Sequence, residues 1–249
     1  YVRNHGGVPH ILWENHKIEV TAGRSMTVGM DCLTDQFNSI NIPVFLACDG
    51  NRRKELNMIR RSKGFSFGAG AIGCAYWKGV LLRDILISAN VWELTQENPE
   101  KRLWVNFEGA DELSNGKYAT SISLDYAMNQ CNDVMIAYAM NNLPLPADHG
   151  YPARLIIPGF VGGRCVKWLS RIWVTDHEND SYHHIYDNRV IPGFVTDKDS
   201  ELAEIFYHHP STVINEQVLN SVIARPAQGE KIPAEDIKKG RNYRIQGFA

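Results

Sequence analysis

The stretch VFLACDGNRRKELNMIRRSKG, residues 44–64, places a single cysteine between an apolar run and a dense group of cations. Cations beside a thiol lower its pKa and favour the thiolate, which acts as a nucleophile, a redox sensor or a soft metal ligand. A buried cysteine next to a solvated basic helix face accounts for the same pattern, so the spacing alone leaves both interpretations open. The cysteine is Cys48, and the basic residues after it are Arg52, Arg53, Lys54, Arg60, Arg61 and Lys63.

The elements around Cys48 are expected to place its sulfur at the end of a strand. The apolar run predicts a strand over 44–48, followed by an Asp-Gly-Asn turn and a helix over 52–62, whose amino-terminal end would face the thiol. A nucleophilic cysteine needs a positioned histidine base, and the sequence has no recognisable Cys-His family signature. The glycine-rich segment 64–73 follows a helix rather than a strand, so it is not interpreted as a phosphate-binding loop.

Strand and helix patterns follow one another irregularly along the rest of the chain. Apolar runs predict strands over 17–21, 103–107, 134–139, 155–158 and 168–175, and helical patterns cover 25–37 and 81–90. An Asn-Asn pair between two apolar stretches predicts a hairpin within 139–146. Because regular βαβ alternation is missing, the fold class is expected to be α+β rather than doubly wound α/β.

The chain divides into two expected domains. Residues 1–205 form the main domain, which includes a long polar loop over 176–199, and residues 206–249 have the short strands and Pro/Gly punctuation of a β-sandwich that is cut off. The sequence begins without methionine and ends in a strand-like stretch, so we expect it to be a fragment.

Composition excludes several classes of protein. A net charge of −2 argues against a general nucleic-acid binder, and no apolar run reaches the roughly 18 residues that span a bilayer. The five cysteines are odd in number and form no C-x-x-C pair, which argues against a disulfide framework or a structural zinc site. A reducing compartment, the cytoplasm, is therefore expected.

Six blocks, in order along the chain, together resemble the sulfite oxidase and eukaryotic nitrate reductase group of molybdenum enzymes. They are YVRNHG (1–6), CDGNRRKELN (48–57), FEGAD (107–111), YATSI (118–122), DHGYPARLIIPGFVGGRCVKWL (148–169) and YDNRVIP (186–192). Within the group, the runs YHHIYDNRV and YHHPSTVINEQVLNSVI are more similar to the assimilatory nitrate reductases. The resemblance implies a sulfite-oxidase-type molybdopterin-binding domain of mixed irregular sheets and helices, followed by the truncated start of an Ig-like β-sandwich dimerisation domain.

The same resemblance implies a molybdenum–pyranopterin dithiolene cofactor whose protein thiolate comes from Cys48. Arginine and lysine donors suit the phosphate of such a pterin. The cofactor contacts that the matching blocks imply, besides Cys48, are Tyr1, Arg3, His5, Asp111, His149, Arg154, Cys165, Val166 and Lys167.

Substrate contacts are implied at four positions. Arg53 matches the arginine that faces the anion in this family, Arg3 is expected on the opposite wall, and Asp187 with Asn188 matches the nitrate reductase pair. The implied reaction is oxygen-atom transfer from nitrate, which yields nitrite in nitrate assimilation. Phe67 stands where the family usually has tryptophan, so an indole N–H donor is replaced by a ring that can still close the pocket.

Partners follow from the same resemblance. In a full-length protein a cytochrome b-type heme domain, an FAD domain and NAD(P)H are expected to supply electrons, and the β-sandwich is expected to form a homodimer; no nucleic-acid or membrane partner is expected. Two alternatives stay open. One is a sulfite oxidase-type enzyme of the same group, and the other is a metal-free scaffold module.

Overall fold

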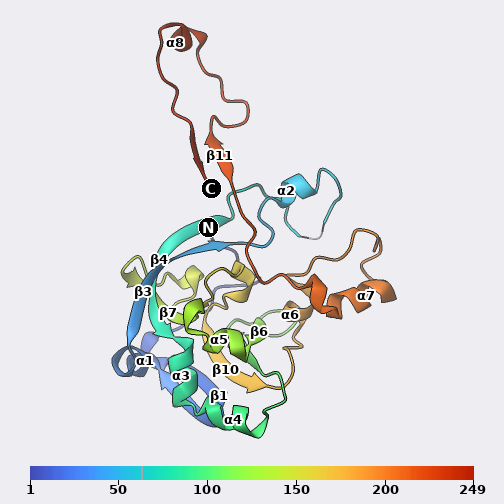
Figure 1. Cartoon of the computed structure of the whole chain (residues 1–249). Coiled ribbons are helices and arrows are strands. Elements are labelled where there is room, and N and C mark those ends of the chain that lie inside the picture. Colours follow the sequence, from blue (N-terminus) through green and yellow to red (C-terminus); the bar gives the residue numbers. More distant parts are fainter. Residues whose placement is uncertain (63) are drawn as a thin grey trace. The chain divides into compact units, whose positions relative to one another are not determined.

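The computed structural model describes residues 1–62 and 64–249 and divides them into two compact units, Tyr1–Glu216 and Gln217–Ala249 (Figure 1). Lys63, one of the cations after Cys48, lies outside the described residues. The first unit contains two five-stranded sheets, and the second contains a two-stranded one. The first unit ends at Glu216, beyond the domain boundary expected after residue 205, and helix α7 crosses that boundary.

One sheet of the first unit joins strands that lie far apart in the sequence. Its order is β2-β1-β10-β5-β6, and every neighbouring pair is antiparallel except β1 with β10. In β1 the residues Ile18, Val20 and Ala22 are buried and those between them are exposed, the two-residue period of a strand with one face in the core. The strands are β1 (Lys17–Ala22), β2 (Arg24–Gly29), β5 (Trp104–Gly109), β6 (Ala119–Ser123) and β10 (Leu169–Thr175).

The other sheet carries the cysteine strand. Its order is β3-β4-β7-β8, and β9 pairs with β7. Gly79 in β4 lies so close to β7 that a Cβ there would come within 2.2 Å of the Ile136 carbonyl oxygen, so only glycine permits this pairing. The strands are β3 (Ser39–Ala47), β4 (Ile72–Leu81), β7 (Met135–Met140), β8 (Leu143–Pro144) and β9 (Arg154–Ile156).

The helices are short, and side-chain caps begin some of them. The Ser200 hydroxyl accepts a hydrogen bond from the Ala203 amide at the start of α7, and Ser123 does the same for α5. Helix α3 turns Leu82, Ile85 and Leu86 into the core. The α-helices of the first unit are α1 (Met30–Gln36), α2 (Arg53–Leu56), α3 (Leu82–Ser88), α4 (Val91–Glu97), α5 (Leu124–Met128), α6 (Tyr182–Tyr186) and α7 (Glu201–His208).

The α+β class and the expected strands are confirmed, whereas two expected helices are wrong and one strand was not predicted. The helix expected over 25–37 is replaced by β2, which pairs along its whole length with β1, and by α1, which begins after Gly29. The helix expected over 52–62 shrinks to the four residues of α2. The glycine-rich segment leads into β4, a strand that the sequence did not suggest.

The expected hairpin is confirmed at Asn141 and Asn142, which both adopt positive φ between β7 and β8. The second unit has an antiparallel pair, β11 (Val222–Arg225) with β12 (Gln246–Phe248), and helix α8 (Ala234–Lys238). Its relation to a β-sandwich stays a prediction. Among the described residues, no helix has the length and apolar character that crossing a bilayer requires.

Candidate active site

A single cavity of about 1160 Å³ in the first unit brings together every residue that the sequence proposed for the site. These residues come from the amino-terminal segment, the end of β3, helix α2, the segment after β5, and the segments around β9, β10 and α6. The list is Tyr1, Arg3, His5, Cys48, Arg53, Asp111, His149, Arg154, Cys165, Val166, Lys167, Asp187 and Asn188. Their individual roles stay predictions, but their convergence is a property of the fold.

Cys48 follows directly after β3, where the backbone leaves the sheet. Its amide donates to the Ala71 carbonyl at 2.9 Å, and its carbonyl accepts from the Asn51 amide at 2.9 Å, so both bonds fix the backbone of a residue that lines the cavity. The expectation that nearby cations lower the pKa of the Cys48 thiol is wrong for the protein without a bound metal. Burial and the neighbouring Asp49 carboxylate raise the pKa of Cys48 to about 11, and Arg53 offsets little of this. A bound metal deprotonates a coordinating thiol outright, so this thiol still suits a metal ligand.

The cations after Cys48 are mostly engaged with other groups. Arg52 pairs with Glu55 at 2.8 Å, and Arg60 donates to the Gly193 carbonyl. Arg60 and Arg61 are exposed, as a solvated basic face would be, but no helix reaches them, and both line the cavity.

The Arg53 side chain is held by a backbone carbonyl and an aromatic ring. Its guanidinium donates to the Phe65 carbonyl at 3.0 Å and lies 5.7 Å from the centre of the Phe67 ring. A Cβ at Gly50 would lie 2.4 Å from this guanidinium, so glycine leaves the room that the side chain occupies. Phe67 is not among the described residues that line the cavity; instead of closing the pocket, its ring supports Arg53.

Lys167 joins the amino-terminal segment to the rest of the site. Its ammonium donates to the Arg3 carbonyl at 3.2 Å, to the Asn4 side chain and to the Asp148 carbonyl at 2.6 Å. Burial, and next the charge of Arg154, lower the pKa of Lys167 to about 7. Arg3 itself stacks on Phe65, with its guanidinium carbon 5.1 Å from the ring centre.

Three buried polar atoms of residues that line the cavity have no partner among the described residues. They are Nε1 of Trp77, Oδ1 of Asp111 and Nε of Arg154, and all three residues are at least nine-tenths buried. Buried polar atoms in folded proteins are nearly always hydrogen-bonded, so an acceptor and two donors left open in the cavity suit a polar ligand. Arg154 also donates to the His149 carbonyl at 3.1 Å, which positions the two residues of the DHG block together.

Cys165 and Val166 line the same wall from the segment between β9 and β10. The Val166 carbonyl accepts from the Leu155 amide at 2.8 Å, and the Cys165 sulfur accepts from the Ile157 amide at 3.4 Å. Burial raises the pKa of Cys165. The thiol therefore stays protonated and packs in the hydrophobic core.

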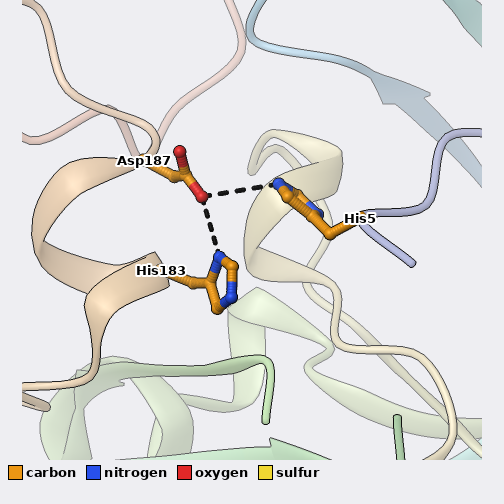
Figure 2. A group of neighbouring side chains, drawn as sticks. All are labelled: His5, His183 and Asp187. Atoms are coloured by element: carbon orange, nitrogen blue, oxygen red, sulfur yellow. Dashed lines mark hydrogen bonds and ion pairs between the residues drawn. The ribbon is translucent and has the colours of Figure 1, made fainter. Parts of the chain in front are cut away.

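Asp187 and Asn188 close the opposite side, just after α6. One oxygen of Asp187 accepts from His183 at 2.9 Å and lies 3.4 Å from His5 (Figure 2). Asn188 adopts a φ of 53°, and its amide donates to the Tyr118 hydroxyl at 3.3 Å. A Cβ at Gly163 would lie 2.2 Å from the Asn188 side-chain oxygen, so glycine leaves room for this side chain.

Sequence reasoning missed Tyr118 and His183. Tyr118 lines the cavity, donates to the Gly163 carbonyl at 2.8 Å and stacks on the rings of His5 and His183. Both residues lie in blocks that carried the resemblance, YATSI and YHHIYDNRV, but neither has a spacing that indicates chemistry. Only the folded chain shows what they contact.

The fully buried Arg164 is hydrogen-bonded to helix α6. Arg164 donates to the Thr120 hydroxyl at 2.7 Å and to Nδ1 of His184 at 2.9 Å, and the other ring nitrogen of His184 contacts Glu178 at 2.9 Å. This chain of hydrogen bonds fixes the helix whose end presents Asp187 and Asn188 to the cavity.

Comparisons with known proteins agree on one family. Residues 5–183 match the model of the oxidoreductase molybdopterin-binding domain. The whole chain is 44% identical to a nitrate reductase [NADH] of Petunia hybrida, 45% to nitrate reductase [NADH] 1 of Nicotiana tabacum and 44% to a nitrate reductase [NAD(P)H] of Hordeum vulgare. It covers 27–28% of the length of these relatives.

A solved structure supports the fold. The crystal structure of the sulfane dehydrogenase SoxCD from Paracoccus pantotrophus superposes with a TM-score of 0.68 and 22% sequence identity. The match covers 91% of this chain and 51% of that one.

Proposed function

Because the chain belongs to the family of oxidoreductase molybdopterin-binding domains, we propose that it reduces nitrate to nitrite at a molybdenum–pterin centre. The observation that carries this proposal is the convergence of all the implied contact residues on one cavity. The nitrate reductases among its relatives favour nitrate over sulfite as the substrate.

The residues present fit the cofactor. The open atoms of Asp111 and Arg154 offer one acceptor and one donor, and the Lys167 ammonium beside Arg3 offers positive charge for a phosphate. Cys48, which lines the same cavity, would hold the metal. The molybdenum–pterin group supplies the two-electron redox chemistry when bound.

The chain's own residues bind and orient the anion. The supported guanidinium of Arg53 offers two parallel N–H donors, and the Asn188 amide offers another, so nitrate is held by charge-assisted hydrogen bonds. Glycines at positions 50 and 163 leave these two side chains their space, so the donors are placed before the substrate arrives. Arg3 adds positive charge on another part of the wall.

The electron donor and the assembly are part of the same proposal. The relatives' names specify NADH or NAD(P)H, and the chain spans about a quarter of their length. We propose that heme b and FAD in further domains carry electrons from the nicotinamide, with a cytochrome b-type domain as the direct donor. Homodimerisation through the segment after Glu216 and a cytoplasmic location belong to this proposal as well.

Loading the chain with the molybdenum cofactor and assaying it with reduced methyl viologen tests the proposal. We expect about one molybdenum per chain and nitrite formation that depends on the metal. Oxidation of sulfite by the loaded protein, without nitrite formation from nitrate, would overturn it. A chain that acquires neither pterin nor molybdenum under conditions that load a plant nitrate reductase would favour the scaffold alternative.

A further inference from the structure

Asp187 lies between two imidazoles at the edge of the proposed substrate pocket (Figure 2). Its Oδ2 atom is 2.9 Å from Nδ1 of His183 and 3.4 Å from Nε2 of His5. His183 belongs to α6 and is buried behind the pocket, whereas His5 comes from the amino-terminal segment and lines the cavity with Asp187. Among the described residues, the ion pairs of Asp187 are with these two histidines.

An ionised Asp187 beside Asn188 poses an electrostatic problem for an anionic substrate. Burial disfavours the carboxylate, but hydrogen bonds from His183 and His5 outweigh this and hold the pKa of Asp187 well below its usual range. The carboxylate is thus negative at any working pH. Its charge is balanced only when the neighbouring imidazoles carry a proton, and histidine is the side chain whose charge ordinarily changes near neutral pH.

The groups that face this His5–Asp187–His183 cluster do not balance the charge of Asp187 in place of the imidazoles. Tyr118 stacks against both imidazoles, and burial raises the pKa of its phenol, so it stays neutral. Tyr182 packs edge-on against His183. The Asp111 carboxyl acts on both histidines, and when ionised it favours their protonation.

Two further charged groups act on the Tyr118 phenol. These are Asp49 and the buried Arg164. His184, next to His183, faces Glu178 and Arg164 on the other side of α6. The imidazoles of His5 and His183 are therefore the protonatable groups, among the described residues, that pair directly with Asp187.

A cation is the other occupant that two imidazoles and a carboxylate can hold, since their ligand atoms all lie within 4.8 Å of one another. The same cavity, however, is lined by Arg3, Arg53, Arg154 and Lys167, whose positive charges repel a metal cation and attract an anion. Charge therefore favours a proton shared with the cluster over a metal ion.

We propose that nitrate binds together with a proton, which the His5–Asp187–His183 cluster takes up and which cancels the charge of Asp187. This deepens the proposed function and rests on it, because nitrate is the anion concerned. Reducing one nitrate with two electrons from the external donor consumes two protons and yields nitrite and water. A proton that enters with the substrate is thus already in the cavity when the removed oxygen atom leaves as water.

Calorimetry of nitrate binding to the oxidised holoenzyme, which has no electrons for turnover, tests the coupling directly. The enthalpy is measured in two buffers of different ionisation enthalpy, from pH 5.5 to 9, and the difference gives the protons taken up per nitrate. We expect uptake to rise toward one as the pH increases, and the nitrate Kd to rise by up to about tenfold per pH unit in that range. No uptake at any pH, with a Kd independent of pH, overturns the proposal.

Two variants and one control assign the effect to the cluster. Asp187→Asn removes the charge that favours protonated imidazoles, so uptake begins at lower pH; His183→Gln raises the Kd roughly tenfold at neutral pH. His177→Gln disrupts an exposed His177–Asp176 pair of 3.1 Å outside the cavity and leaves binding unchanged. Uptake unchanged in both cluster variants contradicts the assignment.

The experiments distinguish a failure of the proton coupling from a failure of the proposed nitrate reduction. A wild-type holoenzyme that forms nitrite but binds nitrate without proton uptake refutes the coupling and leaves nitrate reduction intact. A holoenzyme that oxidises sulfite and forms no nitrite refutes nitrate reduction and, with it, the coupling to nitrate.

Discussion

Replacing Gly163 with alanine is a sharp test of the proposed role of Asn188. Gly163 lies in a short 3-10 helix, and its φ is not positive, so its own backbone tolerates a side chain. A Cβ there would lie 2.2 Å from Oδ1 and 2.8 Å from Nδ2 of Asn188, closer than any real contact. Because Asn188 is only partly buried, its side chain can swing away, and the amide then leaves the position from which it would bind nitrate.

The size of the effect follows from the lost hydrogen bond. A bond to a charged partner contributes about 1.5–3 kcal/mol, which corresponds to a roughly 10- to 150-fold fall in kcat/KM for nitrate. Stability should change little, because losing the Tyr118 contact is partly offset by the lower entropy of alanine in the unfolded chain.

Steady-state kinetics of the loaded enzyme with reduced viologen, together with thermal denaturation, measure both quantities. Gly73→Ala is the matched control, because Gly73 lines the same cavity and a Cβ there meets nothing within 4 Å. A Gly163→Ala enzyme with the wild-type kcat/KM and melting temperature would show that nitrate does not depend on Asn188. An equal loss of activity in Gly73→Ala would show that the cavity wall tolerates no added carbon.

Three further predictions concern single side chains. Cys48→Ser should abolish nitrite formation and reduce molybdenum relative to pterin, measured by metal and pterin analysis; full molybdenum content would exclude Cys48 as the ligand. Tyr118→Phe should destabilise the chain by about 1–3 kcal/mol in urea denaturation, because the Gly163 carbonyl and the Asn188 amide lose their partner. The lowered pKa of Asp187 contributes stability that is present above about pH 4 and lost as the pH falls through its folded value. Asp187→Asn should therefore lose stability less steeply than the wild type below pH 4, and parallel acid-unfolding curves would contradict this.

The sequence predicted most of the cavity wall because the matching blocks carry side chains of specific chemistry. Asp111, Arg154 and Lys167 lie together in the fold although no local pattern brings them close. Their proximity was predicted from the six blocks, whose order along the chain resembles that of a known family. The strand β3 that ends before Cys48 was predictable from its apolar run alone.

What the sequence did not predict depends on tertiary contacts. Cations near Cys48 suggested a thiolate, but burial and Asp49 determine the pKa of the thiol in the folded chain. The sequence 25–29 suggested the start of a helix, and pairing with β1 made it strand β2. Arg60 and Arg61 line the cavity only because α2 ends after one turn, which no local signal marked.

The hydrogen bonds of Lys167 have a consequence for how the protein is made. They tie this side chain to Arg3 and Asn4, which lie 164 and 163 residues earlier. Because contacts so distant in sequence form late, the pterin pocket is incomplete while the ribosome is still translating the middle of the chain. The part of the pocket wall that these hydrogen bonds join therefore forms only after the segment that carries Lys167 has been synthesised.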